Sequence, residues 1–362
     1  MKKFLITLLV MLVLLGLIAG GVFLYLQYEE SGNGRPDEEV TFVIEEGATS
    51  VDISGALADE GLIGNAVWYR FYLSRNEKAT QLQPGTFTLN KSMSYEELTD
   101  ALTQPQQYRA TVRVTFPEGI TAADFARRME EAGLCTREEF LETANTGDFS
   151  QFAFWNRVET DPNCFMKAEG YLFPDTYEFF QDDDVYNMVE KIYANFEAKM
   201  TPELYARMDE LGMSLNEAIT LASFVQEEAG NAEDAHVSAV FHNRLAPNSP
   251  YPRLESNVSS YVQDPDDNNY IYNIMMPYYG SWEAIPQNIY DAYNTYALAG
   301  LPAGPVSNPG IDAIKAALYP DETFLGVYYF FVTDPNGKYY YGRNMAEHEA
   351  NCAVAFSVEK ED

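Results

Sequence analysis

The stretch SLNEAITLASFVQEEA, residues 214–229, carries the clearest helical pattern of the chain. Ser214 and Glu217 form the S-x-x-E pattern of a capping box, which places the start of the helix. At about 100° per residue, the apolar side chains fall in one broad arc, so this helix has a face for a core. The members of the arc are Leu215, Ala218, Ile219, Leu221, Ala222, Phe224, Val225 and Ala229. We expect a mainly helical domain around it.

Glu228 lies inside this apolar arc, between Phe224 and Leu221, whereas Glu227 points out of it. A carboxylate that faces a core is costly if it stays ionised without a partner. It therefore tends to keep its proton, which is the state that a general acid needs. A structural ion pair with Arg244 is the alternative, and the spacing alone favours neither interpretation.

A second unusual stretch is EGYLFPDTY, residues 169–177. Its Phe-Pro-Asp segment is typical of a turn. Glu169 or Asp175 would also supply the second carboxylate that ordinary glycoside hydrolases use. A purely structural turn is the simpler interpretation.

The third unusual stretch is YNTYALAGLPAGPVSNPG, residues 293–310. Two glycines and two prolines within residues 300–305 predict a loop without regular hydrogen bonding of its own. Its Tyr and Asn side chains are of the types that stack on sugar rings and hydrogen-bond to them. The loop is therefore a candidate wall of a polar, aromatic cleft, or else simply a long ordered loop.

The N-terminus predicts a membrane anchor at residues 1–27. Two lysines precede an apolar run from Phe4 to Leu26, which only Thr7 interrupts, and acidic residues follow it. At about 1.5 Å per residue, the run is long enough to cross roughly 30 Å of hydrocarbon. Since a positive flank stays inside, we expect a single-pass protein of the cell membrane with an extracytoplasmic main part. A cleaved signal peptide is the alternative, although no A-x-A site closes the run.

The rest of the chain divides into a linker at 28–39, a small α+β module at 40–106 and a larger region at 107–362, which gives an α+β fold class. In the module, the pattern predicts strands at 40–44 and 86–89 and helices at 50–60, 65–75 and 94–102. In the larger region it predicts strands at 111–116 and 327–332, helices near 121–132, 136–145 and 310–318, mostly helix between 214 and 246, and long loops from there to about 310.

The composition excludes one class of ligand. The chain has 55 acidic and 23 basic residues, a formal net charge of −32, which repels nucleic acid. Three cysteines and three histidines are too few and too scattered to predict a zinc site or a disulfide framework, so we expect no metal and no cofactor. The 26 tyrosines and 22 phenylalanines suit a ligand that is held by stacking and hydrogen bonds.

Six stretches together resemble the endolytic murein transglycosylase family, also called YceG-like, over nearly the whole chain. They are VTFPEGIT (114–121), EGYLFPDTY (169–177), LASFVQEEA (221–229), VFHNRL (240–245), YNTYALAGLPAGPVSNPG (293–310) and AEHEANCA (346–353). The resemblance implies an anchor, a LysM-like module at 40–106 and a lytic transglycosylase domain at 107–362.

Carried over by position, the resemblance makes Glu228 the catalytic glutamate. The chain departs from the family pattern at Gln226, where the family has Glu, at Asn257, where it has Asp, and at Tyr339, where a His is common. We expect the following residues to bind substrate: Glu169, Tyr171, Gln226, Asn243, Arg244, Ser256, Asn257, Tyr293, Asn294, Thr295 and Tyr296.

The implied reaction cleaves the bond between MurNAc and GlcNAc of peptidoglycan. Glu228 protonates the glycosidic oxygen and then takes the proton of the 6-hydroxyl of the same MurNAc, which closes a 1,6-anhydro ring. The substrate supplies the nucleophile, so neither a second carboxylate nor a cofactor is needed. The implied partners are glycan strands, the cytoplasmic membrane and peptidoglycan synthases, the penicillin-binding proteins.

The sequence is compatible with two other functions. One is a water-using muramidase, with Glu169 or Asp175 as its second acid. The other is a catalytically weak scaffold that binds the cell wall, which the departures at Gln226, Asn257 and Tyr339 would favour.

Overall fold

The computed structural model describes residues 20–104, 110–158, 161–229, 233–259 and 269–360, together with 11, 16 and 17. The chain forms two compact units, Met1–Ala110 and Thr111–Asp362, each with its own hydrophobic core. Much of the predicted anchor, Phe4–Leu26, lies outside the described residues. Among the residues that are described, no helix is both long enough and apolar enough to cross a bilayer.

From residue 39 to residue 103, the first unit combines a small sheet with helices. Strands β1 (Glu39–Ile44) and β2 (Gly85–Asn90) pair antiparallel, with Glu39 opposite Asn90 and Ile44 opposite Gly85. The helices are α2 (Ser50–Asp59), α3 (Ala66–Arg75) and α4 (Tyr95–Thr103). These elements confirm the strands and helices predicted for the module. Its LysM-like character stays a prediction.

The second unit contains two further antiparallel sheets and most of the helices. β3 (Thr111–Thr115) pairs with β4 (Thr176–Phe180), and β5 (Phe330–Thr333) pairs with β6 (Tyr339–Gly342). Its helices are α5 (Ala122–Glu131), α6 (Arg137–Thr146), α7 (Val185–Lys199), α8 (Pro202–Leu211), α9 (Leu215–Ala229), α10 (Asp234–Leu245), η1 (Ile271–Met275), α11 (Met276–Tyr279), η2 (Trp282–Ala284), α12 (Gln287–Tyr293), α13 (Ile311–Leu318) and α14 (Met345–Ala355).

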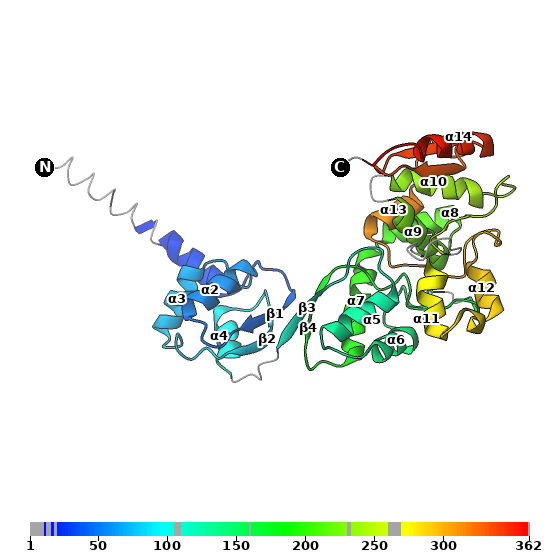
Figure 1. Ribbon diagram of the computed structural model, residues 1–362. Helices are drawn as coiled ribbons and strands as arrows, with labels where there is room; N and C mark the ends of the chain where they lie inside the picture. The colour runs from blue at the N-terminus through cyan, green and yellow to red at the C-terminus, as the bar shows by residue number, and fades with distance from the viewer. Residues whose placement is uncertain are drawn as a thin grey trace. The chain divides into compact units, whose positions relative to one another are not determined.

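Helix α9 is the central helix of the second unit, where α8, α10 and α13 pack against it (Figure 1). Its start is capped as predicted: the Glu217 N–H donates to Ser214 Oγ at 3.2 Å, and the Ser214 N–H donates to Glu217 Oε2 at 2.8 Å. All members of the predicted apolar arc are buried, which confirms the helical register. Thr220 and Ser223 are buried as well, so more of this helix is enclosed than the apolar arc indicates.

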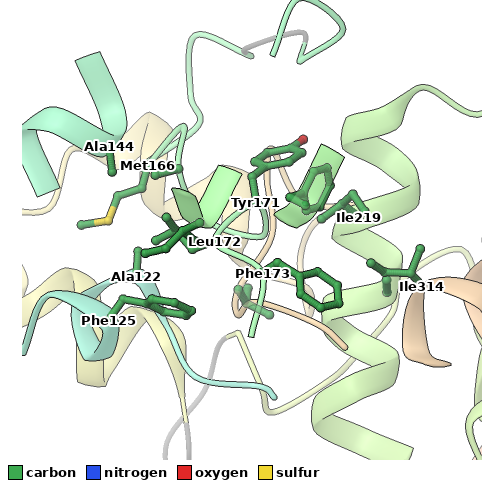
Figure 2. Close-up of a cluster of buried hydrophobic side chains, with 14 of the residues drawn as sticks. Ala122, Phe125, Ala144, Met166, Tyr171, Leu172, Phe173, Ile219 and Ile314 are labelled. Carbon is green, nitrogen blue, oxygen red and sulfur yellow. The ribbon is translucent and has the colours of Figure 1, made fainter. Parts of the chain in front are cut away.

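Residues 171–173 cross the core of this unit between α5 on one side and α9 with α13 on the other (Figure 2). The preceding Gly170 has a φ of +88°. A Cβ at Gly170 would lie only 2.5 Å from Pro305 Cγ and 2.7 Å from Ile219 Cγ2. Glycine at this position therefore allows the backbone to lie between Pro305, in the loop before α13, and Ile219, in the middle of α9.

Two predicted segments differ from the structure. The strand predicted at 327–332 begins only at Phe330, because Asn243 holds the preceding residues in a turn. Its Nδ2 donates to the carbonyl oxygens of Phe324 at 2.9 Å and Tyr328 at 2.6 Å, and its Oδ1 accepts the Gly326 N–H at 2.5 Å. The region predicted as loops up to about 310 also contains the short helices η1, α11, η2 and α12.

Candidate active site

Glu228 lies in the last turn of α9 and lines a pocket of about 420 Å³. The residue as a whole is partly buried, and it is one of the residues that form the pocket wall. Burial raises the pKa of this carboxyl above its ordinary value, and the hydrogen bond from Ser256 opposes part of that rise. The site therefore favours a protonated acid that remains accessible.

Ser256 is the hydrogen-bond partner of the Glu228 carboxyl. Its Oγ donates to Glu228 Oε1 at 2.5 Å, and the same Oγ accepts the Val258 N–H at 3.2 Å. Thr295 fixes the serine, since Thr295 Oγ1 donates to the Ser256 carbonyl at 2.9 Å and accepts its N–H at 3.3 Å. Thr295, in the loop at 293–296, thus positions Ser256, whose hydroxyl binds the Glu228 carboxyl group.

Tyr339 holds the backbone of the same glutamate. Its hydroxyl donates to the carbonyl oxygen of Glu228 at 2.6 Å. A carbonyl in the last turn of a helix has no partner within the helix, so this bond satisfies it and fixes the end of α9. Tyr339, which stands where a His is common in the family, therefore has a defined structural role.

Arg244 does not pair with Glu228, so the structural ion pair named as the alternative for that glutamate is not formed. The Arg244 guanidinium donates to Glu255 Oε2 at 2.9 Å and to the Leu254 carbonyl at 2.6 Å. Its side chain also lies over the Phe330 ring, 4.8 Å from the centroid. Glu255 has a φ of 52°, which a non-glycine residue seldom adopts, so the backbone is strained directly beside Ser256.

The predicted substrate-binding residues fall into two groups. Arg244, Ser256, Asn257 and Tyr296 line the pocket together with Glu228. At its exposed rim, the Tyr296 hydroxyl donates to Asn257 Oδ1 at 2.5 Å. Asn294 and Thr295 support these loops from outside the pocket: the Tyr296 N–H donates to Asn294 Oδ1 at 3.2 Å.

The other predicted residues lie elsewhere in the second unit. Tyr171 and Tyr293 are enclosed in the core, and Asn243 holds the turn before β5. Gln226 Oε1 accepts the Gly310 N–H at 2.8 Å, where α13 begins. None of these four side chains lines the pocket around Glu228.

Glu169 is fully buried and held by three donors. Its Oε1 accepts from the Ala122 N–H and from Asn308 Nδ2, each at 2.8 Å, and its Oε2 accepts from the Tyr270 hydroxyl at 2.8 Å. Burial raises the pKa of Glu169 to about 8. Asp175, the other candidate for a second acid, is exposed and accepts from Asn195 Nδ2 at 3.0 Å. Neither carboxylate lines the pocket.

Much of the pocket wall consists of residues for which the sequence pattern predicts no role. Strand β5, helix α14 and the residue that follows α14 supply a large part of it: Phe330, Phe331, Val332, Met345, His348, Cys352 and Phe356. His348 stacks on Phe330 with 5.0 Å between ring centroids, and its Nε2 lies 3.6 Å from Cys352 Sγ. The AEHEANCA stretch was a signal for this wall, but a sequence pattern alone does not show that it meets Glu228.

The fold and this site define an α+β protein whose larger, mainly helical unit carries a glutamate-centred pocket. The YceG-like family model matches residues 42–354, so the chain belongs to the YceG-like family. It is 30% identical to the endolytic murein transglycosylase of Streptococcus pneumoniae strain D39 over 373 residues, which are 97% of this chain and 65% of that protein. The chain thus spans about two-thirds of the length of that relative.

Two further proteins are similar over most of the chain. The endolytic murein transglycosylase of Bacillus subtilis strain 168 is 26% identical over 341 residues, which cover 92% of this chain and 89% of that protein. A crystal structure of a yceG-like protein from Listeria monocytogenes gives a TM-score of 0.52 at 24% identity, with 86% of this chain and 98% of that chain covered. The likeness to the Listeria structure concerns the fold.

Proposed function

We propose that this chain is an endolytic peptidoglycan lytic transglycosylase. It cleaves the β-1,4 bond between MurNAc and GlcNAc within nascent glycan strands and leaves 1,6-anhydroMurNAc ends. The observation that carries the proposal is Glu228, a carboxyl group whose burial favours the protonated form and which still lines a pocket. The names of the streptococcal and Bacillus relatives support the same class of reaction.

In the proposed reaction, Glu228 first acts as the acid. It gives its proton to the glycosidic oxygen while the bond from that oxygen to C1 of MurNAc breaks, and GlcNAc leaves with a new hydroxyl group. The Glu228 carboxylate then takes the proton of the MurNAc 6-hydroxyl, whose oxygen bonds to C1. Glu228 ends protonated again and no water is consumed. Since the nucleophile is part of the bound sugar, proximity supplies much of the rate.

Ser256 and Tyr339 prepare Glu228 for both steps. The Ser256 hydroxyl stabilises the carboxylate that exists between the two proton transfers, because its O–H donates to Oε1. Tyr339 holds the main chain of the glutamate and so limits where the carboxyl group can move. Tyr296 and Asn257 at the rim suit a sugar ring, by stacking and by hydrogen bonding.

A water-using muramidase would need a second carboxylate near the cleaved bond. Among the described residues that line the pocket, Glu255 is the other carboxylate, and it forms an ion pair with Arg244. Glu255 is therefore a better candidate for that role than Glu169 or Asp175. The ion pair gives Glu255 a structural task, which favours the transglycosylase.

A catalytically weak scaffold is the other candidate function. Two of the three departures from the family pattern have structural partners here, Gln226 at the start of α13 and Tyr339 at the end of α9. Asn257 remains at the pocket rim. None of the three removes the proton donor, so the site supports an enzyme better than a scaffold.

The anchor, the location and the partners belong to the same proposal. The apolar run from Phe4 to Leu26 would hold the protein in the cytoplasmic membrane, with the chain after Leu26 outside the cytoplasm. There the catalytic unit would meet nascent glycan strands beside peptidoglycan synthases. Fractionation of cells, followed by protease treatment of spheroplasts, would test this topology.

The direct test is mass spectrometry of the muropeptides released from peptidoglycan by the full chain. Products with 1,6-anhydroMurNAc ends support the transglycosylase, whereas reducing ends support a muramidase. Binding to insoluble peptidoglycan without any released fragment supports the scaffold.

Three variants sharpen this test. Glu228→Gln keeps the shape of the side chain but loses the acid, and should release no products. Glu227→Gln is the matched control, because Glu227 is the neighbouring acidic residue and does not line the pocket. Glu255→Gln should keep anhydro products as the only products. A reducing-end product that disappears in Glu255→Gln would instead establish the muramidase.

A further inference from the structure

The wall of the Glu228 pocket contains a cysteine that the proposed reaction does not use. Cys352 lies in α14, is partly buried, and lines the pocket together with Glu228. Its thiol is free, as are the thiols of Cys135 and Cys164. Neither of those two residues lines the pocket. Cys352 is therefore the cysteine through which a chemical change of a thiol would reach the candidate active site.

The other two thiols are protected by burial. Burial, together with nearby glutamates, raises the pKa of Cys135 to about 11. Burial also raises the pKa of Cys164, whose Sγ donates to the Met166 carbonyl oxygen at 3.4 Å and accepts from the Tyr293 hydroxyl at 3.8 Å. Since the thiolate is the form that attacks, both thiols should react slowly.

Cys352 differs from them because a base lies beside it. His348 Nε2 lies 3.6 Å from Cys352 Sγ, one helical turn away on α14. Burial lowers the pKa of His348, and the positive charge of Arg244 lowers it further. Glu349 and Glu255 oppose part of this change. The imidazole is therefore neutral at neutral pH, and it can take the thiol proton as the sulfur attacks.

The same wall holds a buried polar group that lacks a partner. Arg244 is only 5% exposed and lines the pocket. Two of its nitrogens donate to Leu254 and Glu255, but its Nε N–H finds no acceptor among the described residues. A buried donor without an acceptor is costly, so a group that brings an oxygen to this wall would be stabilised there. A carboxylate suits the charged guanidinium best.

We infer that Cys352 is a modification site at which a small, carboxylate-bearing disulfide blocks the Glu228 pocket. This inference rests on the proposed function, because it concerns the regulation of the same site. Disulfides persist outside the cytoplasm, where the proposed topology places the pocket. The attached group would occupy part of a pocket of about 420 Å³ and keep the sugar away from Glu228.

The modification is a thiol–disulfide exchange. The thiol proton of Cys352 passes to His348, the Cys352 sulfur bonds to one sulfur of the disulfide, and the S–S bond of the reagent breaks. The departing sulfur keeps the electron pair of that bond, takes the proton from His348, and leaves as a thiol. An added thiol reverses the reaction by the same route, so the block is a switch rather than permanent damage.

The experiment treats the full chain with dithiobis(nitrobenzoate), a disulfide whose two halves each carry a carboxylate. Mass spectrometry of peptides gives the rate at which each cysteine is labelled, and the release of muropeptides gives the remaining activity. Cys352 should be labelled about tenfold faster than Cys135, whose raised pKa leaves little thiolate. Activity should fall in proportion to the label on Cys352 and return when dithiothreitol removes the label.

Three variants separate Cys352 from the other thiols. Cys352→Ser should lose no activity on treatment, relative to its own untreated sample. Cys135→Ser is the matched control and should lose as much activity as the wild-type chain. His348→Gln should slow the labelling of Cys352 several-fold, because it removes the base. Methyl methanethiosulfonate, which adds only a methylthio group to the same thiol, should leave more activity than the larger label.

Labelling of Cys352 that is no faster than that of Cys135 would overturn the inference, as would complete labelling without loss of activity. Equal losses in the wild-type chain and in Cys352→Ser would also reject it. If the untreated chain releases no products, the proposed function fails, and the labelling rates alone decide the modification site. Fast labelling of Cys352 that slows in His348→Gln then supports the site, and equal rates at all three cysteines reject it.

Discussion

Two glutamates of the second unit, Glu228 and Glu169, have much in common and differ in access. Burial raises the pKa of both carboxyl groups, to about 8 for Glu169. Glu169 has no exposed surface and accepts three hydrogen bonds from the protein. Glu228 accepts one from the Ser256 hydroxyl, is partly buried, and lines a pocket.

The difference shows that a raised pKa does not by itself identify a general acid. At Glu169, the surrounding donors leave no room for a substrate, and the carboxyl group joins α5 to the loop before α13 through Ala122 and Asn308. At Glu228, one oxygen is bound by Ser256 and a ligand can approach through the pocket. Access to substrate, added to burial, is what distinguishes the candidate catalytic residue.

The largest expected effect separates the two glutamates by activity. Glu228→Gln should lower kcat by about 10²–10⁴-fold, the usual contribution of a general acid, with a nearly unchanged Tm. Glu169→Gln should keep kcat within a few-fold. Its amide oxygen can accept from the Ala122 N–H and Asn308 Nδ2, and its NH₂ group can donate to the Tyr270 oxygen once the Tyr270 hydroxyl, which donates to Glu169, turns away. Turnover on peptidoglycan and thermal melting of each variant check both statements.

Glu169→Ala is the control for the structural role. It removes the three hydrogen bonds and leaves a void, which should cost about 2–5 kcal/mol of stability. A Glu169→Gln variant that folds normally but loses activity as fully as Glu228→Gln would reverse the assignment of the two residues.

The sequence predicted the parts of this comparison that depend on local pattern. The capping box at Ser214 and the apolar arc of α9 follow from spacing within one helix, and both are confirmed. The strands and helices of the small module are confirmed for the same reason. The position of Glu228 on the buried side of α9 followed from the same register.

The rest depends on contacts between distant segments. Tyr339 reaches the Glu228 carbonyl across 111 positions, and β5 and α14 form the pocket wall from the far end of the chain. Glu169 and Tyr171 lie in a stretch as rich in polar and aromatic residues as the true pocket loops, yet they pack inside the core. A one-dimensional pattern does not distinguish a polar residue that faces a cavity from one that satisfies a buried loop.

The second expected effect concerns how Ser256 tunes Glu228. The Ser256 hydrogen bond lowers the pKa of the glutamate by stabilising its carboxylate, so Ser256→Ala should raise that pKa. The protonated acid would then persist to higher pH, and the alkaline limb of the kcat/KM profile should move upward by up to about one unit. Ser281→Ala, on the surface and without a side-chain cap bond, is the control. A downward shift, or an identical shift in the control, would contradict this role.

The third expected effect concerns stability at Glu169. Its pKa rises from an ordinary 4.5 to about 8 on folding, so between these values the folded chain holds a proton that the unfolded chain has lost. Stability should therefore fall as pH rises through this window, by at most about 1.4 kcal/mol per pH unit from this group. Glu169→Gln should flatten that part of the slope. Denaturant unfolding of both proteins at pH 5, 6, 7 and 8 measures the difference, and parallel curves would show that Glu169 is already ionised.

The smallest expected effect concerns Phe356, which lines the Glu228 pocket and lies just beyond the residues that the family model matches. Phe356 follows α14, beyond the matched residues 42–354, and lines the pocket although 75% of its surface is exposed. An exposed ring beside the acid can stack on a sugar, and such contacts contribute about 0.5–1.5 kcal/mol. Phe356→Leu should therefore raise KM by about twofold to tenfold with little change in kcat. Phe356→Tyr should retain the wild-type KM because it keeps the ring.

The matched control for Phe356 is Val354→Ala. Val354 lies in α14, is 49% exposed, and does not line the pocket. Its substitution should leave KM unchanged, because it removes apolar surface of the same segment without touching the bound sugar. Equal KM values for Phe356→Leu and Phe356→Tyr would show that the ring makes no stacking contact. A fall in kcat with constant KM would instead place Phe356 with the residues that position Glu228. The two glutamates would then differ in the role of their surrounding residues as well as in access, because the residues around Glu169 only enclose it.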